Sequence, residues 1–163
     1  MTGAERIAQV LWESGVRLAF AYPGGTVSRL LAAMSAAGIR LIVGVSEAGC
    51  GHAGQGYHRA SGKIGVVVTT SGPGVTNAIT PLADAFYDGD QVLFLCGQVA
   101  TDQMGRGTRQ DGFQWTPTVR LCQSLSLLAV EPNEAPWRAV QQAIEVMADG
   151  GPAVVSIPAD LLL

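Results

Sequence analysis

The sequence predicts an α/β fold in which helices cover both faces of a parallel sheet. Apolar segments of strand length alternate with segments of helical length along the whole chain. The segment 63–70 is apolar on both faces of the expected strand, which is typical of a parallel sheet that lies between helices. We therefore expect a three-layer α/β/α sandwich that forms a single domain over residues 1–163.

The composition indicates a domain that associates with other chains. Charged residues make up 14% of the 163 residues and apolar residues 48%, and the net charge is −3. An average globular protein has about 25% charged residues. With so few charges to cover its surface, part of that surface is expected to be buried against partner chains. No cluster of Lys and Arg forms a basic stripe, which argues against nucleic acid as a ligand.

The cysteines and the apolar runs indicate in which cellular compartment the protein is found. Cys50, Cys96 and Cys122 are odd in number and widely spaced, so they match neither a disulfide framework nor a zinc site. The first residues lack the pattern of a signal peptide, and no apolar run approaches the ~18 residues of a membrane span. We expect free thiols and a soluble, cytoplasmic protein.

The first half of the chain predicts two complete helix–strand units. Thr2 and Glu5 have the spacing of a capping box, and apolar residues follow at helical spacing as far as Gly15. A strand is expected over 16–22, a helix over 26–37 and a strand over 39–45. A helix rich in glycine and alanine then follows over 47–61.

The second half continues the alternation. A strand over 63–70 is followed by a helix over 75–87, in which Pro81 predicts a late start or a kink. A strand is expected over 91–96. The polar, glycine-rich stretch 97–117 has no period, and loops of that length in a compact domain are usually functional or disordered. A strand over 125–130, a helix over 134–148 and a strand over 153–157 complete the fold.

Four loops of this fold should meet at one edge of the sheet. The carboxyl ends of parallel strands share an edge, and open α/β sheets bind ligands there. That edge gathers Tyr22–Gly25, Ser46–Glu47, Thr70–Gly74 and Cys96–Gln98. Tight turns alone explain the glycines of any single loop, and the helix dipole alone explains a solvated acid at position 47. The four loops together favour a ligand crevice that contains the Glu47 carboxyl group.

Several common cofactor-binding and catalytic motifs do not match this sequence. Gly72–Asn77 imitates a dinucleotide fingerprint, but Asn77 stands where the final glycine belongs and no acidic residue ends the next strand. Gly44–Gly49 is one residue too long for a nucleophile elbow. The sequence holds no P-loop, and His52 and His58 are expected to be packed or solvated rather than ligands.

Ordered motifs along the chain resemble those of acetolactate synthase-like thiamine-diphosphate enzymes. They are Tyr22-Pro-Gly-Gly25, Glu47 with Gly49 and His52, Gly56-Tyr57-x-Arg59, Thr70-Ser-Gly-Pro-Gly-x-Thr-Asn77, Gly97-Gln-Val99 and Phe113-Gln114. The resemblance extends from about residue 4 to 160 and concerns the N-terminal pyrimidine-binding domain of much longer chains. It implies the thiamine-diphosphate-binding fold with a six-stranded parallel sheet.

The resemblance implies a cofactor site around Glu47. In that family the equivalent carboxyl group contacts N1′ of the cofactor's aminopyrimidine ring and activates the cofactor, so Glu47 is the expected catalytic residue. The residues expected to bind thiamine diphosphate are Tyr22, Pro23, Gly24, Gly25, Glu47, Gly72, Pro73, Gly74 and Asn77. Two of them have plain alternatives, since Tyr22 could be a core residue and Asn77 an N-terminal residue of its helix.

The long loop is expected to contribute substrate contacts. By the same resemblance, Phe113 and Gln114 would approach the substrate, although Phe113 could simply anchor the loop. A further hypothesis is that Arg109 or Arg106 binds a substrate carboxylate, because arginine suits bidentate capture. The alternative for both arginines is a solvated loop charge. The chain has Ser46-Glu47-Ala48 where His-Glu-Gln is usual in the family, so the substrate itself is left open.

The family's diphosphate-binding half has no counterpart in the sequence. Asp88-Gly-Asp90 has the wrong order for the Gly-Asp-Gly that holds the metal and diphosphate, and it is expected to be a turn. In that family the cofactor spans domains of different subunits. We therefore expect a separate diphosphate-binding subunit that holds Mg²⁺, in an α2β2 heterotetramer, with no metal ligands from this chain.

The expected function is that of the pyrimidine-binding subunit of a split enzyme. Such an enzyme would decarboxylate a 2-oxo acid such as pyruvate, with or without carboligation. Two alternatives stay open: a non-catalytic regulatory or assembly domain derived from such enzymes, and a piece of a longer chain.

Overall fold

Six parallel strands form one sheet in the computed structural model, which describes residues 1–108, 110–111, 129–130 and 135–163. The order across the sheet is β2-β1-β3-β4-β6-β5. The bounds are β1 (Leu18–Ala21), β2 (Arg40–Val43), β3 (Gly65–Thr69), β4 (Val92–Gln98), β5 (Ala129–Val130) and β6 (Ala153–Pro158). The predicted six-stranded parallel sheet is confirmed.

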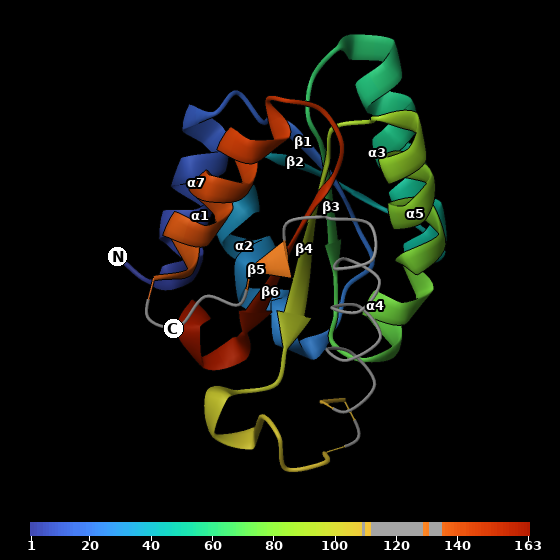
Figure 1. The fold of residues 1–163 in the computed structure, drawn as a ribbon. Coiled ribbons are helices and arrows are strands. Elements are labelled where there is room, and N and C mark those ends of the chain that lie inside the picture. Colours follow the sequence, from blue (N-terminus) through green and yellow to red (C-terminus); the bar gives the residue numbers. More distant parts are fainter. Residues whose placement is uncertain (109, 112–128, 131–134) are drawn as a thin grey trace.

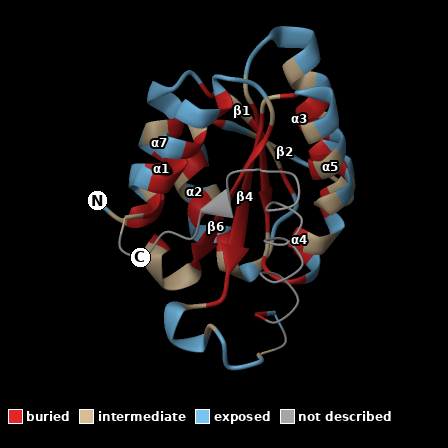
Figure 2. Ribbon diagram, viewed as in Figure 1, coloured by how far each residue is buried: buried red, intermediate tan, exposed pale blue. Residues whose placement is uncertain are grey.

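Helices cover the sheet on both faces, as the sequence predicts (Figure 1). One face carries α1 (Gly3–Glu13), α2 (Ser28–Ala36) and α7 (Pro136–Met147), and the other carries α3 (Glu47–Ser61), α4 (Pro73–Asn77) and α5 (Ile79–Asp88). Short 3₁₀ helices lie at Gly25–Val27, Thr101–Gln103 and Ala159–Leu162. Strands β3, β4 and β6 are buried along their whole length (Figure 2), because side chains on both faces pack under helices.

The capping box at the first helix forms as expected. The Thr2 hydroxyl group accepts a hydrogen bond from the Glu5 amide at 3.2 Å, and the Thr2 amide donates to Glu5 Oε2 at 2.8 Å. Two amides that have no partner within the helix are satisfied in this way.

The helix predicted over 75–87 is wrong in one respect, because two helices occupy this stretch. Helix α4 ends at Asn77 and α5 begins at Ile79, with Ala78 between them. Pro81 has no amide hydrogen to donate to the carbonyl group four residues earlier, and its ring crowds that carbonyl. The interruption therefore lies near Asn77, upstream of the proline.

Two other boundaries differ from the prediction. Strand β4 runs two residues further than expected, because Gly97 and Gln98 pair with Ile157 and Pro158 of β6. Of the strand expected over 125–130, the structure describes only Ala129–Val130, and the earlier residues lie outside the described part.

Helix α3 packs unusually close to its neighbours through glycines. A Cβ atom at Gly51 would lie 2.3 Å from Cγ of Pro81, and one at Gly54 would lie 2.8 Å from Cγ2 of Val67. Both distances are too short for real carbon atoms, so only glycine fits at these positions. Packing therefore explains the glycines at positions 51 and 54 of this helix.

Polar contacts fix the carboxyl-terminal half of α3 to the turn between α5 and β4. The Arg59 guanidinium group donates to both oxygens of Asp90, at 2.6–3.0 Å, and to Asp88 Oδ2 at 2.6 Å. Gln55 Nε2 adds a bond of 3.2 Å to Asp90, whose side chain is buried. This arrangement supports the expectation that the Asp88-Gly-Asp90 stretch is structural.

Acid is expected to weaken the fold through Asp90. Hydrogen bonds from Arg59 hold the pKa of this carboxyl group below its ordinary value, so the folded chain binds the proton more weakly than the unfolded chain. The carboxylate therefore contributes fully to stability above the unfolded pKa of about 4, and its contribution is lost as the pH falls through the lower folded value. The free energy of unfolding of Asp90→Asn, measured by denaturant titration, should depend less on pH below about 5 than that of the unsubstituted chain.

The control is Asp84→Asn, which changes an exposed carboxylate. Parallel pH profiles for Asp90→Asn and the unsubstituted chain would contradict the assignment.

Candidate functional site

The structure brings the four predicted loops together at the carboxyl edge of the sheet. Thr26 Oγ1, just after the first loop, lies 3.1 Å from Thr70 Oγ1 in the third. A Cβ atom at Gly97, in the fourth, would lie 2.2 Å from Thr26 Oγ1. A Cβ atom at Gly74 would lie 3.4 Å from Glu47 Oε1, which joins the second and third loops. The edge is therefore one continuous site.

Glu47 is a buried acid at the first position of α3. Ser46 caps this helix by accepting a hydrogen bond from the Gly49 amide at 3.1 Å, which directs the chain inward at the end of β2. Glu47 is only 7% exposed, and its Oε2 accepts a hydrogen bond from Asn77 Nδ2 at 3.1 Å. The alternative of a solvated first-turn acid is therefore wrong.

Glycines let two loops pack closely beside this acid. A Cβ atom at Gly24 would lie 2.3 Å from both Cβ and Oγ1 of Thr70, and one at Gly74 would lie 2.8 Å from Cγ2 of the same threonine. A side chain at Gly24 would therefore overlap Thr70, and one at Gly74 would also lie 3.4 Å from Glu47 Oε1. Gly25 has no such neighbour within 4 Å and begins the 3₁₀ helix that leads into α2.

The other predicted cofactor residues lie at the same edge. Tyr22 is 37% exposed, so the alternative of a core residue is wrong. Pro23 is exposed, and Pro73 begins α4. Gly72 has a φ of 63°, which favours glycine, and packs against Gln110. Asn77 is the last residue of α4 and not an N-terminal one, so that alternative is also wrong.

The predicted substrate residues are not placed. Arg109, Phe113 and Gln114 lie outside the described residues. Arg106 is described and is exposed to solvent.

Two hydroxyl groups at the edge were not predicted as site residues. Thr26 Oγ1 accepts a hydrogen bond from the Ser71 amide at 3.2 Å in addition to its contact with Thr70. A signal for both exists in the sequence, since each threonine directly adjoins a glycine-rich or glycine-proline turn at the end of a strand. The sequence was interpreted to place Thr26 at the start of a helix and Thr70 in a loop at the sheet edge.

The side chains of Cys50 and Cys96 near the site are buried and form no disulfide, whereas Cys122 lies outside the described residues. Burial raises the pKa of the Cys50 thiol, and the negative charge of Glu47 one helical turn earlier raises it further. Cys50 is therefore a protonated packing residue, and Gly44 has no room for a side chain beside its sulfur.

Neither histidine belongs to a metal site in the described part of the chain. His52 Nδ1 lies 2.9 Å from Gln55 Oε1, and His58 Nδ1 lies 3.0 Å from the carbonyl oxygen of Lys63. The described residues contain no group of three or more His, Cys, Asp or Glu side chains suited to a metal ion. Among the same residues, no helix combines the length and the apolar character needed to span a membrane.

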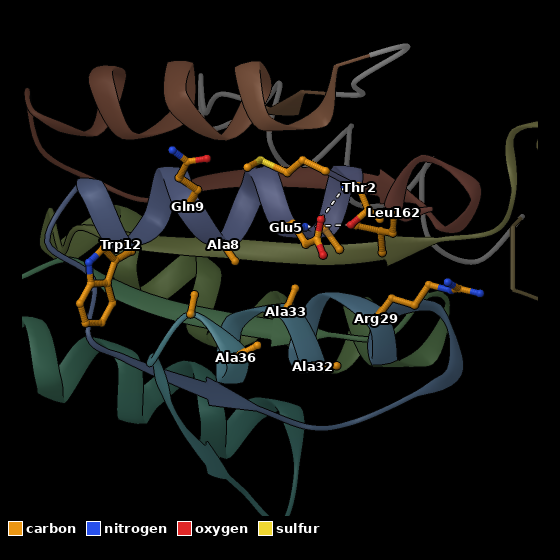
Figure 3. A pocket seen from close by; sticks show the side chains of 13 residues that line it. Thr2, Glu5, Ala8, Gln9, Trp12, Arg29, Ala32, Ala33, Ala36 and Leu162 are labelled. Carbon is orange, nitrogen blue, oxygen red and sulfur yellow. Dashed lines mark hydrogen bonds between the residues drawn. The ribbon is translucent and has the colours of Figure 1, made fainter.

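A cavity of about 700 Å³ lies elsewhere, between α1 and α2 on the other face of the sheet (Figure 3). Six of its thirteen lining residues are alanines, and Trp12 and Arg29 are among the larger ones. It contains neither Glu47 nor any other residue of the four loops. This cavity is therefore separate from the candidate site around Glu47 at the sheet edge.

The arrangement at the edge suits proton exchange with a flat, nitrogen-containing ligand. A buried carboxyl group can share a proton with a ring nitrogen, and Asn77 fixes the orientation of that carboxyl group by binding its other oxygen. The glycines allow a ring to approach closely.

Comparisons with known proteins agree with this description. The family described as thiamine pyrophosphate enzyme, N-terminal TPP binding domain, matches residues 1–118. The chain is 36% identical to the mitochondrial acetolactate synthase catalytic subunit of Saccharomyces cerevisiae, over 99% of this chain and 24% of that one. It is 38% identical to the acetolactate synthase isozyme 2 large subunit of Escherichia coli, over 100% of this chain and 30% of that one.

A solved structure shows the same fold. The thiamine diphosphate-dependent 4-hydroxybenzoylformate decarboxylase of Rhodococcus jostii RHA1 superposes with a TM-score of 0.89 at 23% identity. The match covers 99% of this chain and 31% of that one. The chain thus spans about a quarter to a third of the length of the proteins it matches.

Proposed function

The chain belongs to the thiamine pyrophosphate enzyme family as an N-terminal TPP binding domain, and from this membership we propose that it forms the pyrimidine-binding half of an active site. The enzyme would act on a 2-oxo acid such as pyruvate, by decarboxylation with or without carboligation. The observation that carries the proposal is the buried Glu47 carboxyl group, held by Asn77 at the edge where the loops meet.

The residues at this edge fit an aminopyrimidine ring. Glu47 would hold a proton at one carboxyl oxygen against a ring nitrogen, while the other oxygen stays bonded to Asn77. Gly74 places no side chain beside the Glu47 carboxyl group, and Gly72–Gly74 would line one side of a flat ring bound there. When bound, thiamine diphosphate supplies an electron sink for the electrons released on loss of carbon dioxide.

Exposed apolar side chains beside the site support a partner chain. Val43, the last residue of the edge strand β2, is 64% exposed, and Val45, two residues beyond the strand and two before Glu47, is 95% exposed. Two large apolar side chains exposed next to the candidate site fit an interface with another chain. We propose that a separate diphosphate-binding subunit covers them in an α2β2 assembly and holds Mg²⁺ with the cofactor's diphosphate.

The test is binding of the cofactor to the native assembly. The chain, purified with the proteins that associate with it, should bind thiamine diphosphate in the presence of Mg²⁺, measured by calorimetry. The same preparation should release carbon dioxide from pyruvate or another 2-oxo acid. An assembly that forms but binds no thiamine diphosphate would contradict the proposal and would favour a non-catalytic assembly domain. Recovery of the segment only within one longer polypeptide would contradict the split-subunit arrangement and leave the role of Glu47 intact.

A further inference from the structure

A backbone amide and two threonine hydroxyl groups form a chain of hydrogen bonds at the candidate site. The Ser71 amide can only donate, so Thr26 Oγ1 is the acceptor in their contact of 3.2 Å. Thr26 Oγ1 also lies 3.1 Å from Thr70 Oγ1, and either hydroxyl group can donate in that contact. A hydroxyl group that already accepts a hydrogen bond becomes a better donor. The favoured direction therefore runs from Ser71 through Thr26 to Thr70.

This direction leaves the proton of the Thr70 hydroxyl group available. Among the described residues, no hydrogen bond other than the contact with Thr26 satisfies this hydroxyl group. Thr70 is half-buried, so a ligand can reach it. Two fully buried donors nearby, Ser71 Oγ and Gln98 Nε2, also have no hydrogen-bond partner in the described part of the chain. Unpaired buried polar groups are rare in folded proteins, so their presence beside Thr70 indicates that this edge has unused hydrogen-bonding capacity.

The Thr70 side chain is close to the proposed catalytic acid. A Cβ atom at Gly74 would lie 2.8 Å from Cγ2 of Thr70 and 3.4 Å from Oε1 of Glu47, so the methyl group of Thr70 is the part of this side chain that faces the acid. The hydroxyl group lies on the side of Gly24 and Thr26: a Cβ atom at Gly24 would lie 2.3 Å from Thr70 Oγ1, and Thr26 Oγ1 is 3.1 Å away. The threonine is thus held by two glycines from different loops.

We propose that the Thr70 hydroxyl group binds an oxygen atom of the 2-oxo acid substrate, and that Thr26 is the positioning residue that directs its proton; this inference rests on the proposed function. A neutral donor suits this role because it can bind an oxygen on which negative charge develops without first pairing with the Glu47 carboxylate. Thr70 is then a specificity-determining residue for substrates with an acceptor oxygen at this point.

The experiment uses the native assembly with Thr70→Val, Thr70→Ser and Thr26→Val in this chain. Binding of methyl acetylphosphonate, a 2-oxo acid analogue that cannot lose carbon dioxide, is measured by calorimetry alongside the affinity for thiamine diphosphate. Thr70→Val should weaken analogue binding about tenfold and lower kcat/KM about 100-fold, with unchanged cofactor affinity. Thr70→Ser should restore both values to near those of the unsubstituted assembly. Thr26→Val should give a smaller loss, of a few-fold, because it removes only the donor to Thr70.

The outcomes separate this inference from the function on which it rests. Thr80→Val, on the exposed surface of α5, is the control for loss of a threonine hydroxyl group. If the unsubstituted assembly binds the cofactor and the analogue and Thr70→Val binds both equally well, the role of Thr70 is overturned and the function stands. An equal loss of cofactor and analogue affinity in Thr70→Val, unrelieved in Thr70→Ser, would show a merely structural role. If the unsubstituted assembly binds no cofactor, the proposed function and the inference fail together.

Discussion

Replacement of Glu47 by glutamine is expected to lower thiamine-diphosphate-dependent turnover of the native assembly by 100-fold or more. Glutamine has nearly the same shape and its side-chain oxygen can still accept the hydrogen bond from Asn77, so the fold should be retained. It cannot share a proton with a ring nitrogen, and removal of a positioned acid or base typically lowers a rate about 10²–10⁴-fold. Carbon dioxide release from the 2-oxo acid measures the effect.

The control for this substitution is Glu13→Gln. Glu13 ends α1, on the opposite face of the sheet, and its exposed carboxyl group contacts only Gln9 among the described side chains. This variant should turn over substrate at the rate of the unsubstituted assembly. Full activity of Glu47→Gln, with thermal unfolding unchanged, would remove the central residue from the proposed site.

Substitution of Gly51 by alanine is expected to destabilise the fold by about 1–3 kcal/mol, the typical cost of overpacking a core. The added carbon would lie 2.3 Å and 2.5 Å from two atoms of the Pro81 ring, which cannot rotate away. Helix α3 must therefore move from α5, and since α3 begins with Glu47, turnover should fall as well. Denaturant unfolding measures the loss of stability.

Gly56 provides a matched control five positions further along the same helix. A Cβ atom there would meet nothing within 4 Å. Gly56→Ala should therefore stabilise the fold by about 0.5–1 kcal/mol, because alanine favours the helix. Equal effects of the two substitutions would show that the close contact of α3 with Pro81 is unimportant.

Local patterns predicted most of the fold. The capping box of Thr2 and Glu5, the buried strand β3 and the glycine-rich α3 all depend on residues close together in the chain. The sequence predicted one helix with a late start or a kink caused by Pro81, whereas the structure has a break between α4 and α5, because the effect of Pro81 falls on a carbonyl group four residues upstream. The extra length of β4 depends on pairing with β6, which no local pattern contains.

The site was predictable in its location but not in its contacts. The glycines and the acid at strand ends identified the edge, since parallel strands bring their carboxyl ends together. The bond between Asn77 and Glu47 joins residues 30 positions apart, and the contact between Thr26 and Thr70 spans 44 positions. Side-chain geometry over such separations is set by packing, so the sequence predicted Asn77 as a ligand residue but not as the partner of the acid.

The exposed end of β2 has a consequence for how the chain must be produced. Strand β2 is the outermost strand of the sheet, so one row of its backbone amide and carbonyl groups faces away from β1, and Val43 beside it is exposed. An outer strand of this kind is a template for pairing with another copy, and Arg40 is the exposed charge on it that opposes such pairing. Molecules in which nothing covers this strand would aggregate through it, so under the proposed two-subunit arrangement co-expression with the second subunit should raise the yield of soluble chain.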